Sequence, residues 1–162
     1  MSVAAGIILL VGAVLIYNFF SLSADGFYLS HYQAYEVGTV RNEGENGELV
    51  KAYREKRYKD VISIHTNGGN NAKSDFLAAI SQLQLNDPPA AIKLLEKTVN
   101  DSPANSQVKE EAEYYLAIAY VKNRDFDLAI PLLEKIKNDP DHHYYERVSA
   151  KMIRQVKMLK WR

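Results

Sequence analysis

The chain contains no cysteine, and its 20 Lys and Arg residues are balanced by 20 Asp and Glu residues. The absence of cysteine excludes disulfide bonds, thiolate metal sites and a cysteine nucleophile. Because the formal net charge at pH 7 is zero, the chain also lacks the strongly basic character of a nucleic-acid-binding domain. We therefore expect no nucleic acid among its partners.

Charged residues are missing from residues 2–24, whereas they are frequent in the rest of the chain. A run of about 20 apolar residues is long enough to cross the hydrocarbon core of a bilayer as a helix. We predict a membrane anchor over residues 1–24, with residues 3–22 in the lipid bilayer. The alternative is a signal peptide cleaved near residues 21–23, but the basic residues that open a signal peptide are absent here. The pattern favours a retained anchor, and a longer native N-terminal segment is a further alternative.

Residues 25–47 form an aromatic-rich connector that ends in a loop. Aromatic rings next to a membrane span are favoured at the level of the lipid headgroups. We interpret the rings of the connector in this way, with packing onto the following domain as the alternative. The Gly- and Asn-rich residues 38–47 predict a flexible loop. The rings recur at helical spacing, as Phe27, Tyr28, Tyr32 and Tyr35.

From Glu48 onward, apolar residues recur at intervals of three and four, which is the period of a helix. The breaks fall at turn and capping residues such as Asn86-Asp87-Pro88. No alternating run is long enough to predict a strand. The expected helices cover residues 48–56, 58–66, 72–85, 88–100, 105–123, 126–138 and 142–161. The sequence therefore predicts an all-α fold.

The sequence A-I-x-L-L-E-K occurs twice, at Ala91–Lys97 and, 38 residues later, at Ala129–Lys135. A helix with a small residue precedes each copy, Ala79 in one case and Ala117 in the other. Residues 57–62 resemble a degenerate first copy, 30 residues before the second. Internal repetition of this kind indicates stacked helix pairs.

These residues resemble the tetratricopeptide repeat (TPR) family. The third copy matches the family pattern at Leu116, Ala117, Tyr120, Phe126, Ala129, Leu133 and Pro140. The second copy matches at Ala79, Ala91, Leu95 and Pro103, with Gln82 and Pro88 replacing aromatic residues. The resemblance covers Glu48 to Trp161. It implies a domain over 48–162, an antiparallel helix-pair solenoid with units 48–66, 72–103 and 105–140.

The last predicted helix, residues 142–161, is amphipathic. Its apolar stripe consists of Tyr145, Val148, Met152, Val156 and Leu159, and Arg147, Lys151 and Arg154 lie opposite. A terminal repeat needs a cap that buries one face and exposes the other. We therefore interpret this helix as a C-terminal cap, with attachment to anionic lipid as the alternative.

Catalytic constellations with useful spacing are missing from the sequence. His142 and His143, beside Asp139 and Asp141, do not predict a metal site, because neighbouring residues on a helix point in different directions. We interpret them as a solvated helix start. Gly68-Gly69 lacks the Lys-Ser/Thr of a phosphate-binding loop. We therefore expect a protein that is not an enzyme, with no cofactor, no metal and no small-molecule substrate.

The resemblance implies that the first helix of each pair lines a concave face. In the second and third copies this candidate partner-binding groove consists of Lys73, Phe76, Ile80, Leu83, Glu111, Tyr114, Ile118 and Lys122. Aromatic rings flanked by opposite charges suit a peptide or a partner helix. In the alternative interpretation Phe76 and Tyr114 are core residues. Lys73 and Lys122 are expected to be solvated.

The sequence predicts a single-pass, membrane-anchored protein–protein interaction scaffold with a protein or peptide partner on its concave face. The layout is similar to that of bacterial N-terminally anchored TPR proteins, which implies a periplasmic or other extracytoplasmic domain. One alternative is a receptor or chaperone-type module that captures peptides or unfolded proteins. Another is a structural subunit of a larger membrane complex.

Overall fold

A computed structural model describes residues 7, 10–13, 16, 22–37, 47–68, 71–104 and 106–162. These residues form helices and no strand, which confirms the all-α prediction. The helices from residue 22 onward are α2 (Ala24–His31), α3 (Gly47–Arg54), α4 (Tyr58–Gly68), α5 (Ala72–Gln84), α6 (Pro88–Asp101), α7 (Gln107–Asn123), α8 (Phe126–Lys137) and α9 (Ala150–Lys160).

Most of the predicted anchor and of the loop 38–47 lies outside the described residues. Within the part of the chain that the structure describes, every helix is too short or too polar to cross a membrane.

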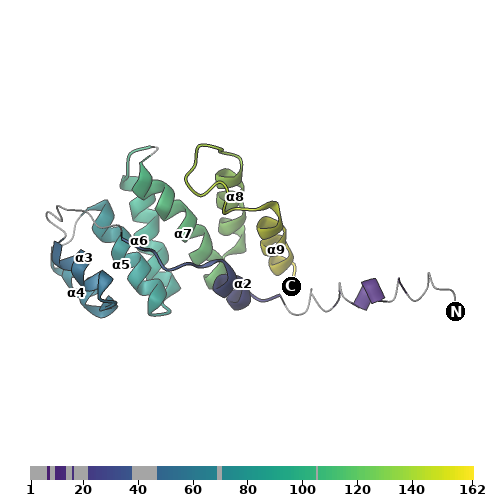
Figure 1. Cartoon of the computed structure of the whole chain (residues 1–162), viewed down its shortest axis with the longest axis horizontal. Helices are drawn as coiled ribbons and strands as arrows, with labels where there is room; N and C mark the ends of the chain where they lie inside the picture. Colours follow the sequence, from purple (N-terminus) through teal and green to yellow (C-terminus); the bar gives the residue numbers. More distant parts are fainter. Residues whose placement is uncertain are drawn as a thin grey trace.

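Consecutive helices pack as pairs, and the pairs stack in a row that α9 closes (Figure 1). Each pair is joined by a short turn in which one residue has a left-handed backbone: Lys56 (φ 58°), Asn86 (φ 61°) or Arg124 (φ 68°). A residue with a left-handed backbone conformation commonly ends a helix, because the chain changes direction there. These three residues are 30 and 38 positions apart, the same offsets as the sequence repeats. The α3–α4 pair, which contains residues 57–62, thus has the same turn conformation as the two pairs that follow it.

Small residues lie where the paired helices touch. Ala79 and Ala91 in the second pair, and Ala117 and Ala129 in the third, are fully buried. A methyl side chain allows two helix axes to approach at the short end of the usual 8–10 Å. The structure agrees with the small-residue positions taken from the repeat.

The C-terminal helix is shorter than predicted, since it begins at Ala150 and not at residue 142. Ser149 caps it, and the Met152 N–H donates to the Ser149 Oγ at 3.1 Å. Residues 138–149 form turns and not a helix. Val148 in this segment is nevertheless buried, so the apolar residues keep a helix-like spacing where the chain is not helical. Within α9, the buried residues of the predicted stripe pack toward α8, as a cap requires.

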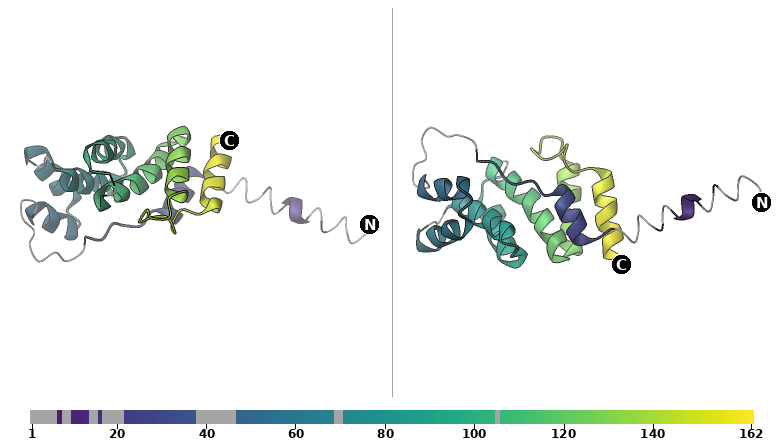
Figure 2. Two further views of the ribbon diagram at one scale, coloured as in Figure 1. Left: turned by 90° about the horizontal axis from the view of Figure 1, so that it is seen from above. Right: turned by 60° about the horizontal axis from the view of Figure 1, so that its bottom comes forward.

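The connector belongs to the domain core, so its interpretation as a set of headgroup-level rings is wrong. Phe27 is 2% exposed and Tyr28 is 8% exposed. They lie on α2, which packs against α7 and α9. Residues 32–37 then run without helical structure across the stacked helices toward α3 (Figure 2). We call residues 22–37 the connector segment.

Candidate functional site

The predicted groove residues lie on α5 and α7, on the side that the connector segment covers. Phe76, Glu111 and Tyr114 are buried, and Ile80, Ile118 and Leu83 belong to the core beneath them. Lys73 is half-buried. Phe76 and Tyr114 are therefore core residues, as the alternative interpretation has it, and the face they share is occupied by the protein's own chain.

The groove holds the connector segment by its main chain. Three tyrosine hydroxyls donate hydrogen bonds of 2.9 Å to backbone carbonyl oxygens of the segment. The accepting carbonyls belong to every second residue, the first at the end of α2 and the other two in the non-helical residues that follow it. The bonds are Tyr114 to His31, Tyr115 to Gln33, and Tyr53 to Tyr35.

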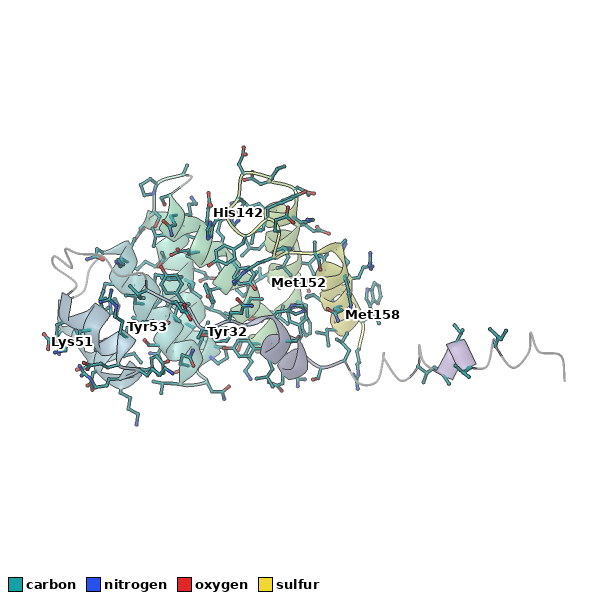
Figure 3. All side chains as sticks on the ribbon, in the orientation of Figure 1. Tyr32, Lys51, Tyr53, His142, Met152 and Met158 are labelled. Carbon is teal, nitrogen blue, oxygen red and sulfur yellow. The ribbon has the colours of Figure 1, made fainter. Side chains whose placement is uncertain are left out.

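Aromatic contacts fix the side chains of the segment. The Tyr35 ring lies edge-on to Phe76 at 4.8 Å and to Tyr115 at 6.2 Å, measured between ring centroids. The Tyr32 ring stacks on Tyr28 at 4.8 Å, and its hydroxyl accepts a 2.9 Å hydrogen bond from Gln84 Nε2. The Tyr53 ring also contacts Tyr35. Tyr32 and Tyr53 are labelled in Figure 3.

Lys122 is not the solvated residue that the sequence predicts. Its side chain is 18% exposed, and its Nζ lies 2.7 Å from Asp25 Oδ1 on α2. The same Nζ sits 5.1 Å from the centre of the Tyr28 ring. The Lys122 ammonium lowers the pKa of Asp25 through a hydrogen bond and direct charge attraction. Lys122 therefore holds the connector segment in place.

Two cavities remain open beside Tyr35. The larger, about 740 Å³, we call the Arg147 cavity, and the smaller, about 360 Å³, the Lys73 cavity. Gln107 and Glu111 line both, and the Gln107 Nε2 donates to the Glu111 Oε1 at 2.8 Å. Predicted groove residues border both cavities: Lys73 and Phe76 line the smaller one, and Glu111 lines both.

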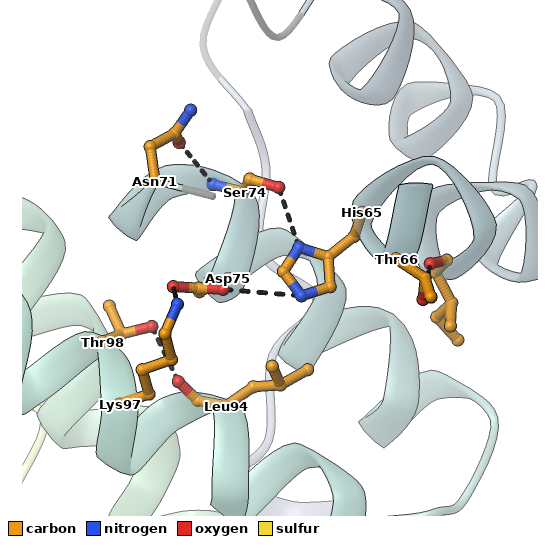
Figure 4. Close-up of polar contacts among 9 residues, drawn as sticks. His65, Thr66, Asn71, Ser74, Asp75, Leu94, Lys97 and Thr98 are labelled. Carbon is orange, nitrogen blue, oxygen red and sulfur yellow. Dashed lines mark hydrogen bonds and ion pairs between the residues drawn. The ribbon is translucent and has the colours of Figure 1, made fainter. Parts of the chain in front are cut away.

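Two buried carboxylates occupy equivalent places in successive repeats, although the sequence suggests for one of them, Glu113, only a favourable position near the start of a helix. Asp75 on α5 and Glu113 on α7 are each 2% exposed. Asp75 Oδ2 is 2.5 Å from Lys97 Nζ (Figure 4), and Glu113 Oε1 is 2.6 Å from Lys135 Nζ. Both members of the pair recur after 38 residues, so the repeat offset was the signal that could have revealed them.

A histidine stands beside each of these carboxylates. His65 Nε2 lies 3.4 Å from Asp75 (Figure 4), and His142 Nε2 lies 3.5 Å from Glu113. His142 is 4% exposed, and its Nδ1 accepts the Tyr144 N–H at 3.0 Å. The interpretation of His142 as part of a solvated helix start is therefore wrong. Among the described residues, no cluster of acidic and histidine side chains is suited to hold a metal ion.

Replacing Glu113 by lysine is expected to lower the free energy of unfolding by about 3–5 kcal/mol, because the new cation is buried next to Lys135 with no anion to balance it. Denaturant unfolding measures this change. Glu146→Lys is the matched control, since Glu146 is exposed and should shift the stability by less than about 0.5 kcal/mol. Equal stabilities for the two variants would contradict the burial of the Glu113 carboxylate.

Comparison with known families agrees with this geometry. A model of the tetratricopeptide repeat matches residues 111–142. The matched stretch contains most of α7, all of α8 and the Glu113–Lys135 pair. No curated protein and no solved structure matches the chain. A tetratricopeptide repeat suggests a protein–protein interaction module, and such repeats generally bind proteins or peptides.

Residues of the groove that the sequence interpretation missed include Tyr53, Tyr115 and Gln84. The available signal was the high tyrosine content, 11 of 162 residues. A buried tyrosine hydroxyl needs a hydrogen-bond partner, so a tyrosine-rich helical domain contains many sites at which a chain segment can be fixed.

Proposed function

We propose that this protein is a membrane-anchored protein–protein interaction scaffold that acts by binding and not by catalysis. The observation that carries this proposal is the groove along α5 and α7, where tyrosine hydroxyls hold the connector segment by alternate carbonyl groups. In peptide recognition, hydrogen bonds to the main chain of the bound segment supply affinity, and here tyrosine hydroxyls donate them. The tetratricopeptide repeat over residues 111–142 points to the same class of function.

The anchor of this scaffold is the apolar stretch over residues 3–20, shorter than the predicted 3–22 because Leu22 packs against the domain core. The anchor rests on the length of the uncharged stretch. We place the domain on the extracytoplasmic side because the layout is similar to that of bacterial N-terminally anchored TPR proteins. If it holds, alkaline carbonate washing leaves the full chain in the membrane fraction. Recovery of a mature chain that starts near residue 24 would show a cleaved signal peptide and overturn the anchor.

The partner is a protein or peptide that binds across the two open cavities. Lys73 lines one of them and makes no ion pair with any described residue. Arg147 lines the other and is exposed, with its guanidinium over the Tyr144 ring at 5.5 Å. Glu111, shared by both cavities, supplies the opposite charge between them. The surface therefore suits a partner segment that carries both acidic and basic groups.

Photo-crosslinking in native membranes tests this assignment. A photoreactive residue placed at position 73 or 147 is expected to capture the same partner, identified by mass spectrometry. The controls are positions 59 and 93, exposed lysines on α4 and α6 that lie outside both cavities. A partner captured at 59 and 93 but not at 73 and 147 would move the binding site to the other face.

A peptide receptor or chaperone-type module is a second candidate, because hydrogen bonds to main-chain carbonyls do not depend on the side chains of the bound segment. This function requires an incoming peptide to displace residues 32–37. Hydrogen exchange of the connector segment distinguishes the two functions once a partner is known. Its protection stays constant when the partner binds a scaffold, and it falls when a peptide takes its place.

A further inference from the structure

The connector leaves little distance between the proposed anchor and the domain. Only residues 21–23 separate the apolar stretch, which ends at Phe20, from the first residue of α2. One residue spans at most about 3.6 Å, so Phe20 and Ala24 are within about 15 Å of each other. Because α2 is packed into the core through Phe27 and Tyr28, the domain cannot swing away on a loose tether. With the proposed anchor in the membrane, the end of the domain formed by α2 and α9 is held next to the bilayer.

A cleft of about 510 Å³ opens at this end, lined by residues of α2 and α9. Lys151 and Arg154 line it, and neither forms an ion pair with any described residue. Ser23 also lines it. The Ser23 Oγ accepts the Gly26 N–H at 3.0 Å and keeps its own proton free to donate.

The basic residues on the other side of α9 are neutralised. Lys157 Nζ lies 2.7 Å from Glu134 Oε1 on α8, and Lys160 pairs with Asp127 on the same helix. Lys151 and Arg154 therefore carry the positive charge of α9 that these pairs do not compensate, and they face the cleft and α2. This charge is complementary to an anionic surface.

Exposed apolar side chains accompany this charge. Trp161 is 85% exposed, Leu29 on α2 is 78% exposed, and Met158 in the cleft wall is 39% exposed. Lys151, Arg154, Met158 and Trp161 recur at intervals of three and four, so they share one stripe of α9 and its end. Tryptophan beside basic residues is the composition favoured at a membrane interface.

We propose that the α2–α9 end of the domain lies on the bilayer surface and that Lys151 and Arg154 bind the phosphate of an anionic phospholipid headgroup in this cleft. The proposal rests on the proposed anchor, which brings the cleft to the membrane. Trp161 and Met158 enter the interfacial layer beside the bound headgroup. The contact fixes the orientation of the scaffold, with the stacked helix pairs extending away from the cleft (Figure 1).

Trp161 reports on this contact directly, because it is the only tryptophan in the chain. The full chain is reconstituted into vesicles of phosphatidylcholine alone or of phosphatidylcholine mixed with phosphatidylglycerol. With phosphatidylglycerol present, we expect a blue shift of the tryptophan emission and a loss of quenching by acrylamide. We also expect quenching by lipids that carry bromine on their acyl chains.

Lys151→Glu/Arg154→Glu is expected to return the Trp161 signals to those seen with phosphatidylcholine alone, while the chain still floats with the vesicles. Lys59→Glu/Lys93→Glu is the control with the same change of charge, placed on α4 and α6 away from the cleft. If the first variant does not fold, Lys151→Gln/Arg154→Gln replaces it and should weaken the same signals.

Two results overturn the proposal while leaving the anchor intact. One is a chain that floats with the vesicles but keeps Trp161 open to acrylamide in both lipid mixtures. The other is a Trp161 shift that depends on neither phosphatidylglycerol nor Lys151 and Arg154. A chain that floats with neither kind of vesicle would instead overturn the anchor, and the lipid contact with it.

Discussion

Truncation of Tyr115 to alanine is expected to lower the free energy of unfolding by about 3–5 kcal/mol, the usual cost of removing a large buried aromatic side chain. Tyr115 is 2% exposed and joins the groove to the connector segment. Its removal takes away a ring that packs against both the groove helices and the connector segment. It also removes the hydrogen bond to the Gln33 carbonyl. Denaturant unfolding measures the change. The rings in contact with Tyr115 are Tyr32, Tyr35, Phe76, Tyr114 and Tyr144.

Two further variants separate the ring from the hydroxyl. Tyr115→Phe keeps the ring contacts and removes the hydrogen bond, so it should cost only about 1 kcal/mol. Tyr145→Ala removes a half-buried ring whose described contact is with Lys137, and it should cost less than Tyr115→Ala. If Tyr145→Ala and Tyr115→Ala were equally destabilising, the connector segment would not depend on Tyr115 as the structure requires.

The helix pairs could be predicted from the sequence because their determinants are local. Asn86-Asp87-Pro88 combines a residue that accepts a left-handed backbone, a capping carboxylate and a proline suited to the first turn of α6. The repeat offset and the helical period likewise decide which side of α5 and α7 the predicted groove residues occupy, but they do not reveal that most of these residues are buried. Such patterns can be recognised in the sequence without knowledge of the tertiary structure.

The occupant of the groove could not be predicted in the same way. Residues 32–37 have no regular period, and the bond from Tyr115 to Gln33 joins positions 82 residues apart. The spacing of Phe27 and Tyr28 fits a membrane interface as well as a protein core, so only the structure distinguishes the two. His142 was misjudged for a similar reason, because it is buried by a turn that lies where the sequence pattern suggested a helix.

The domain is expected to unfold cooperatively as the pH rises from about 10 to about 12. Burial raises the pKa of the Tyr28 and Tyr144 hydroxyls to about 12, against an ordinary value of 10. Burial also raises the pKa of Tyr53, Tyr114, Tyr115 and Tyr120. Because the folded state holds these protons more tightly than the unfolded state, its stability is complete below pH 10 and is lost as the pH rises through the raised pKa values.

The loss should be steep because several phenols act together. Each buried hydroxyl that stays protonated while its unfolded counterpart ionises removes about 1.4 kcal/mol per pH unit, and a domain of this kind has a total stability of about 5–15 kcal/mol. The helical signal in circular dichroism and the phenolate absorbance near 295 nm should therefore change together. Tyr28→Phe should move this transition to higher pH, since it removes one buried phenol and keeps the ring that stacks on Tyr32. Phenolate absorbance that reaches its full value for all 11 tyrosines near pH 10 while the helical signal stays constant would mean that the buried rings are open to water. The packed connector segment would then be wrong.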